Sequence, residues 1–172
     1  MPYKVSTEGM EELGEMLRAL GESAESVAAS ALYEGAGVMA NEIRSSAESI
    51  RTEPFKFARP GDHRLPSPEE KEIVLSAEGS GIAKFQRDGD GVQTSVGYAK
   101  AGYAELAGKT VPIPLIANSI NSGTSFMIKQ PFMRKAASTG GKKATKVITE
   151  KIETEWQRIY RESQKFAGRK NR

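Results

Sequence analysis

Side chains suited to catalysis are few in this chain of 172 residues, and their spacing matches no catalytic pattern. The single histidine, His63, lies in a segment of Pro, Gly, Asp and Arg residues, where a solvated loop side chain is expected. The chain has no cysteine, which removes disulfides, thiolate nucleophiles and zinc-thiolate sites together. The sequence therefore indicates a protein that is not an enzyme and that uses no cofactor or metal.

Carboxylates and glycines occur in groups that helix and turn formation already explain. Glu11-Glu12 and Glu69-Glu70 each fall in an expected first helical turn, where the helix dipole favours acidic side chains. Gly79-Ser80-Gly81 lacks the third glycine of a dinucleotide-binding loop, and Gly140-Gly141-Lys142-Lys143 lacks the upstream part of a phosphate-binding loop. Asp88-Gly89-Asp90-Gly91 resembles the start of a calcium loop, but the distal glutamate is missing, so a hairpin turn is expected.

Charge is divided unevenly along the chain. Residues 1–80 contain 8 basic and 15 acidic residues, a net charge of −7, whereas residues 81–172 contain 17 and 7, a net charge of +10. Three explanations are open: a fold that pairs the two halves, complementary surfaces on neighbouring copies, or a basic face for nucleic acid. Residues 134–172 carry 12 basic and 4 acidic residues. The alternative function is therefore a small nucleic-acid-binding or regulatory protein that uses a basic C-terminal helix.

Helical periodicity dominates both ends of the chain. Within residues 7–50, apolar spacing predicts a helix over 7–20, a break at Gly21, and a second helix of roughly 40 Å. Gly35 and Gly37 inside that helix indicate a bend, a close approach by another element, or a tolerated defect. The other end predicts a helix over 141–166, whose apolar face comprises Val147, Ile148, Ile152, Trp156, Ile159 and Tyr160. Because Trp156 and Tyr160 lie on this face, they are expected to belong to the core.

The middle of the chain predicts short elements. Three prolines make 51–66 an extended loop, and its Phe55, Phe57 and Arg59 are candidate contact residues. A short helix is expected over 67–79, because Ser67-Pro68-Glu69-Glu70 has the form of a capping box. Residues 83–120 form the expected sheet region, with a hairpin over 83–98, an irregular stretch over 99–114 and a strand within 111–120. The order of elements indicates one α+β domain across residues 1–172, a small, mainly antiparallel sheet packed by a long N-terminal helix and a C-terminal helix.

Three lysines near the expected start of the last helix need an explanation outside the helix. Lys142, Lys143 and Lys146 would oppose the helix dipole there. Together with Lys129 they are predicted to contact an acidic face of a neighbouring copy, or DNA.

The segment 116–136 resembles the signature region of the tailed-bacteriophage neck proteins. This family includes tail-completion, tail-terminator-like and head-tail joining proteins. Within the segment, residues 121–136 are predicted to form a signature loop. The family pattern is an apolar strand that ends in a polar or acidic residue, then any one residue, Gly-Thr and a short variable loop. Gln or Arg, then Pro-Phe, then Leu or Met follow, and a basic amphipathic C-terminal helix ends the pattern. The positions that match it are Asn121, Gly123, Thr124, Pro131, Phe132 and Met133. Gly123 permits a tight turn, Thr124 can bond to the backbone, and Pro131 and Phe132 are expected to anchor the last helix.

This resemblance implies a non-enzymatic virion component. It implies a ring homo-oligomer, with a hexamer expected, that completes the tail or joins it to the head. The implied partners are other copies of the chain, the head-tail connector, and tail-tube or terminator proteins, with DNA passing nearby. No membrane partner is expected, and the implied location is the virion, with the bacterial host cytoplasm as the place of assembly.

Overall fold

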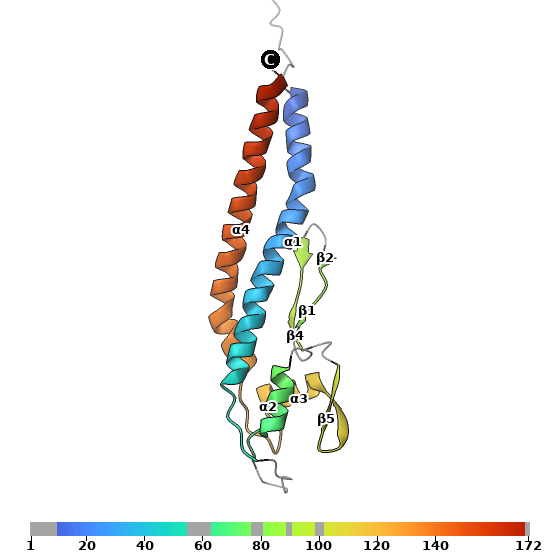
Figure 1. The fold of residues 1–172 in the computed structure, drawn as a ribbon, viewed down its shortest axis with the longest axis vertical. Coiled ribbons are helices and arrows are strands. Elements are labelled where there is room, and N and C mark those ends of the chain that lie inside the picture. Colours follow the sequence, from blue (N-terminus) through green and yellow to red (C-terminus); the bar gives the residue numbers. More distant parts are fainter. Residues whose placement is uncertain (1–9, 55–62, 77–80, 89–90, 99–101, 171–172) are drawn as a thin grey trace, which may run out of the picture.

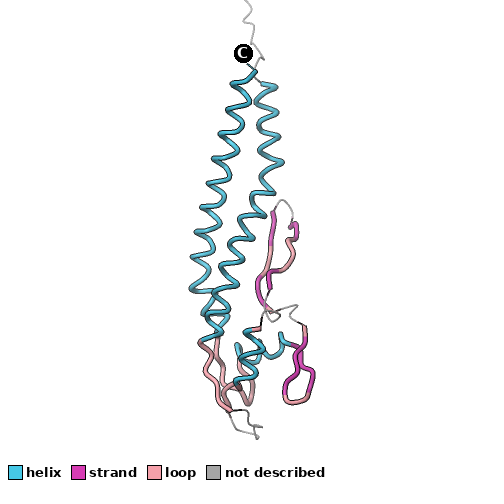
Figure 2. Tube along the Cα trace, viewed as in Figure 1, coloured by secondary structure: helices cyan, strands magenta, loops and turns pink. Residues whose placement is uncertain are grey.

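Two long helices form an arm that dominates the molecule. The computed structural model describes residues 10–54, 63–76, 81–88, 91–98 and 102–170. Helices α1 (Met10–Glu48) and α4 (Phe132–Lys170), of 39 residues each, run side by side in opposite directions (Figure 1). At about 1.5 Å per residue, each is roughly 58 Å long. The shorter elements gather around the half of the arm where α1 ends and α4 begins (Figure 2).

Within the described ranges, the strands form three antiparallel pairs. Their bounds are β1 (Gly81–Ile82), β2 (Gln86–Asp88), β3 (Gly91–Gln93), β4 (Val96–Gly97), β5 (Tyr103–Leu106) and β6 (Lys109–Pro112). Because β1 pairs with β4 and β2 with β3, these four strands make one interrupted hairpin, which contacts α1. Strands β5 and β6 form a second, tight hairpin. Its two central residues, Ala107 and Gly108, have φ values of 50° and 73°, as a two-residue turn of the right twist requires.

Two short helices complete a head around one apolar core. Helix α2 (Pro68–Leu75) begins with a capping box between Ser67 and Glu70, and α3 (Ile113–Ser122) follows β6 directly. The core joins the end of α1 to α2, α3 and the start of α4, and comprises Ile43, Ala47, Ile50, Val74, Tyr98, Ile113, Ile116, Ala117, Ile120, Met127, Phe132 and Ala136.

Beyond the head, glycines allow the two arm helices to pack closely. A Cβ placed on Gly35 would lie 2.5 Å from Cγ1 of Ile148, and one placed on Gly140 would lie 2.9 Å from Sδ of Met39. Apart from its chain neighbours and the nearby backbone of α1 itself, no described atom lies within 4 Å of a Cβ placed on Gly37. Gly35 therefore marks a close approach of α4 to α1, whereas Gly37 is a tolerated glycine.

The predicted α+β class is confirmed, with long N-terminal and C-terminal helices packed against each other and small antiparallel sheets beside them. The capping box at Ser67 and the hairpin over 83–98 are also as predicted. The predicted short helix ends earlier than residue 79, at Leu75, where Ser76 caps it.

The predicted limits of both long helices were wrong. Helix α1 passes through Gly21 without a break, and α4 begins at Phe132 and not at residue 141. The predicted signature loop 121–136 is therefore helical at both ends, since residues 121–122 finish the helix Ile113–Ser122 (α3) and residues 132–136 begin α4. A helical glycine costs only about 1 kcal/mol relative to alanine, which packing along the partner helix readily offsets.

The strand predicted within 111–120 was also wrong, because that segment is mostly helix α3. Pro112 precedes the helix and Pro114 lies in its first turn, where the missing N–H groups cost nothing. The buried residues Ile113, Ile116, Ala117 and Ile120 recur every three or four positions, the period of a helix. The stretch 99–114, expected to be irregular, holds the β5–β6 hairpin.

Candidate interaction surfaces

The signature segment begins with a tight turn that only glycine suits. Gly123 follows α3 with φ of 77°, and a Cβ there would lie 3.0 Å from Cβ of Lys129 and 3.1 Å from the carbonyl oxygen of Met127. The Thr124 hydroxyl accepts hydrogen bonds from the N–H groups of Phe126 (3.3 Å) and Met127 (3.0 Å). The Thr124 N–H donates to the Met127 carbonyl at 3.1 Å. Both residues therefore shape the loop itself.

The rest of the signature positions the start of α4. Oδ1 of Asn121 accepts a hydrogen bond from the Met133 N–H at 3.1 Å, which satisfies a donor that a helix start leaves unpaired. Phe132 is 3% exposed, and its ring meets Tyr98 edge-on with centroids 6.1 Å apart. Pro131 is exposed, so it directs the chain without being an internal anchor. Phe132 has the predicted anchoring role.

The base of the loop 51–66 is fastened to the signature segment. The Gln130 side chain accepts a hydrogen bond from the Arg51 N–H (2.9 Å) and donates one to the Arg51 carbonyl (2.8 Å). The backbone of Arg64 pairs with the same segment, since its N–H donates to Phe126 (2.9 Å) and its carbonyl accepts from Ile128 (2.8 Å). The predicted contact residues Phe55, Phe57 and Arg59 lie outside the described residues.

An ion pair buried behind this loop joins it to α2. Nη2 and Nη1 of Arg64 donate to the two carboxylate oxygens of Glu70 at 2.6 and 2.7 Å, and the Ser67 N–H donates to the same carboxylate at 2.7 Å. Burial alone would raise the pKa of Glu70, but the hydrogen bonds from Arg64 and Ser67 outweigh it and hold that pKa below its ordinary value. The hydrogen bond to Glu70 also raises the pKa of Arg64. This ion pair therefore has a structural role, because it fixes the end of the loop 51–66 to the start of α2.

The predicted contact lysines do not form one cluster at a helix start. Lys142, Lys143 and Lys146 are exposed along α4, about 15 to 21 Å beyond its first residue. Lys143 Nζ lies 2.9 Å from Glu42 of α1, and Lys146 Nζ lies 3.7 Å from Glu150 in its own helix. These lysines therefore do not oppose the helix dipole as predicted, because the helix begins earlier, at Phe132. Lys129 is exposed beside the signature turn.

The two arm helices carry opposite charge. Helix α1 contains 2 basic and 8 acidic residues, a net charge of −6, and α4 contains 11 and 4, a net charge of +7. Besides the Glu42–Lys143 pair, Nζ of Lys151 lies 2.8 Å from Glu34. The hydrogen bond to Glu34 raises the pKa of Lys151. The fold thus pairs the acidic and basic halves of the chain, the first of the three explanations, yet much charge on each helix faces outward.

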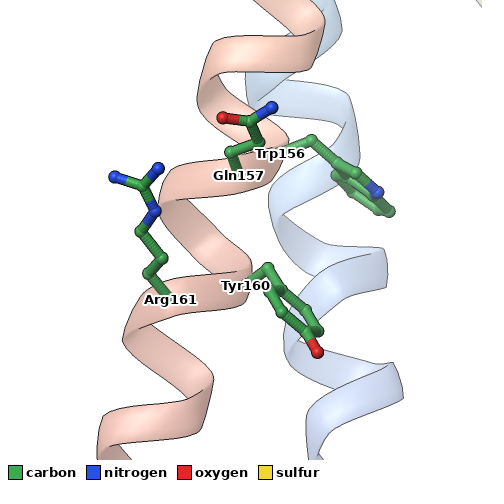
Figure 3. A pocket seen from close by; sticks show the side chains of 4 residues that line it. All are labelled: Trp156, Gln157, Tyr160 and Arg161. Atoms are coloured by element: carbon green, nitrogen blue, oxygen red, sulfur yellow. The ribbon is translucent and has the colours of Figure 1, made fainter.

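A stripe of large apolar side chains is exposed on the far half of α4. Ile152, Trp156 and Tyr160, here called the α4 stripe, are 40%, 46% and 58% exposed. Trp156 and Tyr160 line a shallow hollow with Gln157 and Arg161. Figure 3 shows the two rings leaving α4 on one side, while Gln157 and Arg161 project on the other.

The prediction that Trp156 and Tyr160 belong to the core was wrong. Residues spaced by four advance about 40° around a helix at each step, so a stripe with this spacing turns away from a single straight neighbour. Val147, Ile148 and Ile159 of the same predicted face are half-buried. The signal for exposure was present in the sequence, since the apolar arc of α4 is wider than one helix can cover.

Groups that could do chemistry are scarce in the described structure. His63 is exposed, and no group of three or more His, Asp or Glu side chains in the described ranges could hold a metal ion. In the described part of the chain, none of the helices combines the length and apolar character that crossing a bilayer would require. Comparison of the chain with protein-family models, with curated proteins and with solved structures gave no match.

Proposed function

We propose that this protein is a structural subunit of a tailed-phage neck, which assembles with copies of itself into a ring that completes the tail or joins it to the head connector. The observation that carries the proposal is the α4 stripe. Trp, Tyr and Arg are the residue types that dominate protein–protein hot spots, and exposed apolar patches mark contact surfaces. Such a role needs binding surfaces and no catalytic group, cofactor or metal.

The signature segment supports the same proposal. Gly123, Thr124, Asn121 and Phe132 each have a specific structural task in the turn between α3 and α4. A family whose members share this turn would need these residue types at this spacing. The resemblance implies a hexameric ring, located in the virion between the connector and the tail tube.

A second candidate is a small nucleic-acid-binding or regulatory protein. The observation in its favour is the first half of α4, where the exposed charged residues up to Thr149 are all basic: Arg134, Lys135, Lys142, Lys143 and Lys146. A phosphate backbone would be attracted to such a face, and its affinity would fall steeply with salt.

Native mass spectrometry of the purified chain over a range of concentrations, with negative-stain imaging of the same samples, tests the first proposal. We expect a single ring size, and imaging with isolated phage tail tubes should show capped tube ends. A chain that stays monomeric at every concentration and only shifts the mobility of duplex DNA, in a salt-sensitive way, would replace the neck proposal with the second candidate.

A further inference from the structure

We infer that the α4 stripe of one copy packs on the α1 segment Ser23–Ser30 of the next copy, so that neighbouring arms meet side by side in a head-to-tail contact. This inference rests on the proposed self-assembly and names the surfaces that carry it. The partner is therefore a second copy of this chain, and the two surfaces that meet are different ones.

The first support is the height of the two surfaces along the arm. Gly35 lies against Ile148, Glu34 against Lys151, and Glu42 against Lys143. In antiparallel helices, each step along α1 is matched by an equal step back along α4, so residues 152–160 are level with residues 23–31. In a ring whose axis follows the arm, all copies stand at the same height, and these two segments would meet without any shift.

The second support is shape. Ser26 and Ser30 are exposed and Ser23 is half-buried, all at helical spacing on α1, so this face presents small side chains. A neighbouring helix can approach such a face closely, which leaves room for the large rings of Trp156 and Tyr160.

The third support is charge complementarity, which also argues against a symmetric contact. If two copies joined their α4 stripes to each other, helices of net charge +7 would lie together. Packing α4 on α1 along the whole arm instead brings +7 against −6. This attraction acts outside the contact itself, since residues 152–160 and residues 23–30 each carry a net charge of −1. A contact between two different surfaces also leaves each copy with one donor face and one acceptor face, which is the arrangement that closes into rings.

Disulfide trapping in the full-length protein tests this arrangement, because the chain has no cysteine of its own. One variant carries Ser30→Cys and another carries Ile152→Cys. We expect oxidation of a mixture of the two variants to give a covalent dimer that contains one chain of each kind, and each variant alone to give almost none. A strong dimer from Ile152→Cys alone, or wild-type rings without a mixed dimer, would overturn the inference and leave the proposed ring standing.

Loss of contact gives an independent test. A stripe variant, Trp156→Ser with Tyr160→Ser, and an α1 variant, Ser26→Lys with Ser30→Lys, should each raise the concentration that gives half-assembly by at least about tenfold. Mixed together, they should form one-to-one dimers and nothing larger, since each retains one intact face. Tyr103→Ser changes a tyrosine that is 70% exposed on β5, and Ser45→Lys adds a lysine about 22 Å further along α1, so both serve as matched controls.

Circular dichroism of each variant shows whether the helices remain, which is expected because the changed side chains are exposed. Assembly of either double variant at the wild-type concentration, or a mixture without dimers, would overturn the inference. A wild-type chain that never assembles would overturn both the inference and the proposed function.

Discussion

Replacing Gly35 by alanine should destabilise the protein, whereas replacing Gly37 by alanine should stabilise it. Both glycines lie in α1, and alanine is the better helix former by about 1 kcal/mol at either position. The two positions differ in the room available for an added Cβ atom. A Cβ on Gly35 would lie 2.5 Å from Cγ1 and 2.6 Å from Cδ1 of Ile148, while a Cβ on Gly37 would have no described atom within 4 Å apart from its chain neighbours and the nearby backbone of α1.

The magnitudes follow from these two terms. Gly37→Ala should stabilise the protein by about 1 kcal/mol, because only the helix propensity changes. At Gly35 the added methyl must displace Ile148 from its place against α1, an overpacking cost of about 1–3 kcal/mol. The difference between the two variants therefore isolates that cost, since the helix propensity term is common to both.

Urea unfolding followed by circular dichroism, at a concentration where the protein is monomeric, measures this difference from the transition midpoints. The Ile148→Ala background provides the internal check. Removing Cγ1 and Cδ1 leaves the carbonyl oxygen of Ala144, at 3.4 Å, as the nearest contact, so Gly35→Ala should become stabilising there. Equal stabilisation by Gly35→Ala and Gly37→Ala in the wild-type background would refute the close approach of α1 and α4 at Gly35. It would also remove one of the contacts that decide which residues of α1 are level with the α4 stripe.

Two further predictions concern the head. Glu70→Gln should lower the free energy of unfolding by about 3 kcal/mol at neutral pH, because it removes the carboxylate that pairs with the Arg64 guanidinium. Glu69→Gln, at an exposed position of the same helix, should lower it little. Because the pKa of Glu70 is lowered on folding, its stabilisation is present above the ordinary value of 4.5 and is lost as the pH falls through the lower folded value. Urea midpoints measured in pH steps should then show the gap to Glu70→Gln closing below pH 4.5; a gap that persists unchanged in strong acid would contradict this assignment. Gly123→Ala should lower the free energy of unfolding by about 1–3 kcal/mol. The loss should exceed that of Gly102→Ala, because both glycines have positive φ but only Gly123 is crowded by Lys129 and Met127. Equal losses at the two positions would mean that backbone strain alone decides.

Local features of the fold could be predicted from the sequence because short-range chemistry specifies them. Ser67, Pro68 and Glu70 satisfy the first N–H groups of α2 within four residues, so the capping box formed as predicted. The turn near Asp88 likewise needs only its own neighbours. The α+β class followed from the order of such segments. In contrast, β5–β6 turns through Ala107 and Gly108, a pair with a weak turn signal, and was missed.

Tertiary packing decided the remaining features, since each depends on which partner a surface meets. The sequence by itself determined that α4 would be amphipathic and basic, and that α1 would be acidic. Only the structure decided that Gly21 and Gly140 lie inside continuous helices, because the partner helix offsets their cost. The same holds for Trp156 and Tyr160: their apolar character is a property of the sequence, but their exposure follows from the packing of α4 against α1 in the described part of the chain.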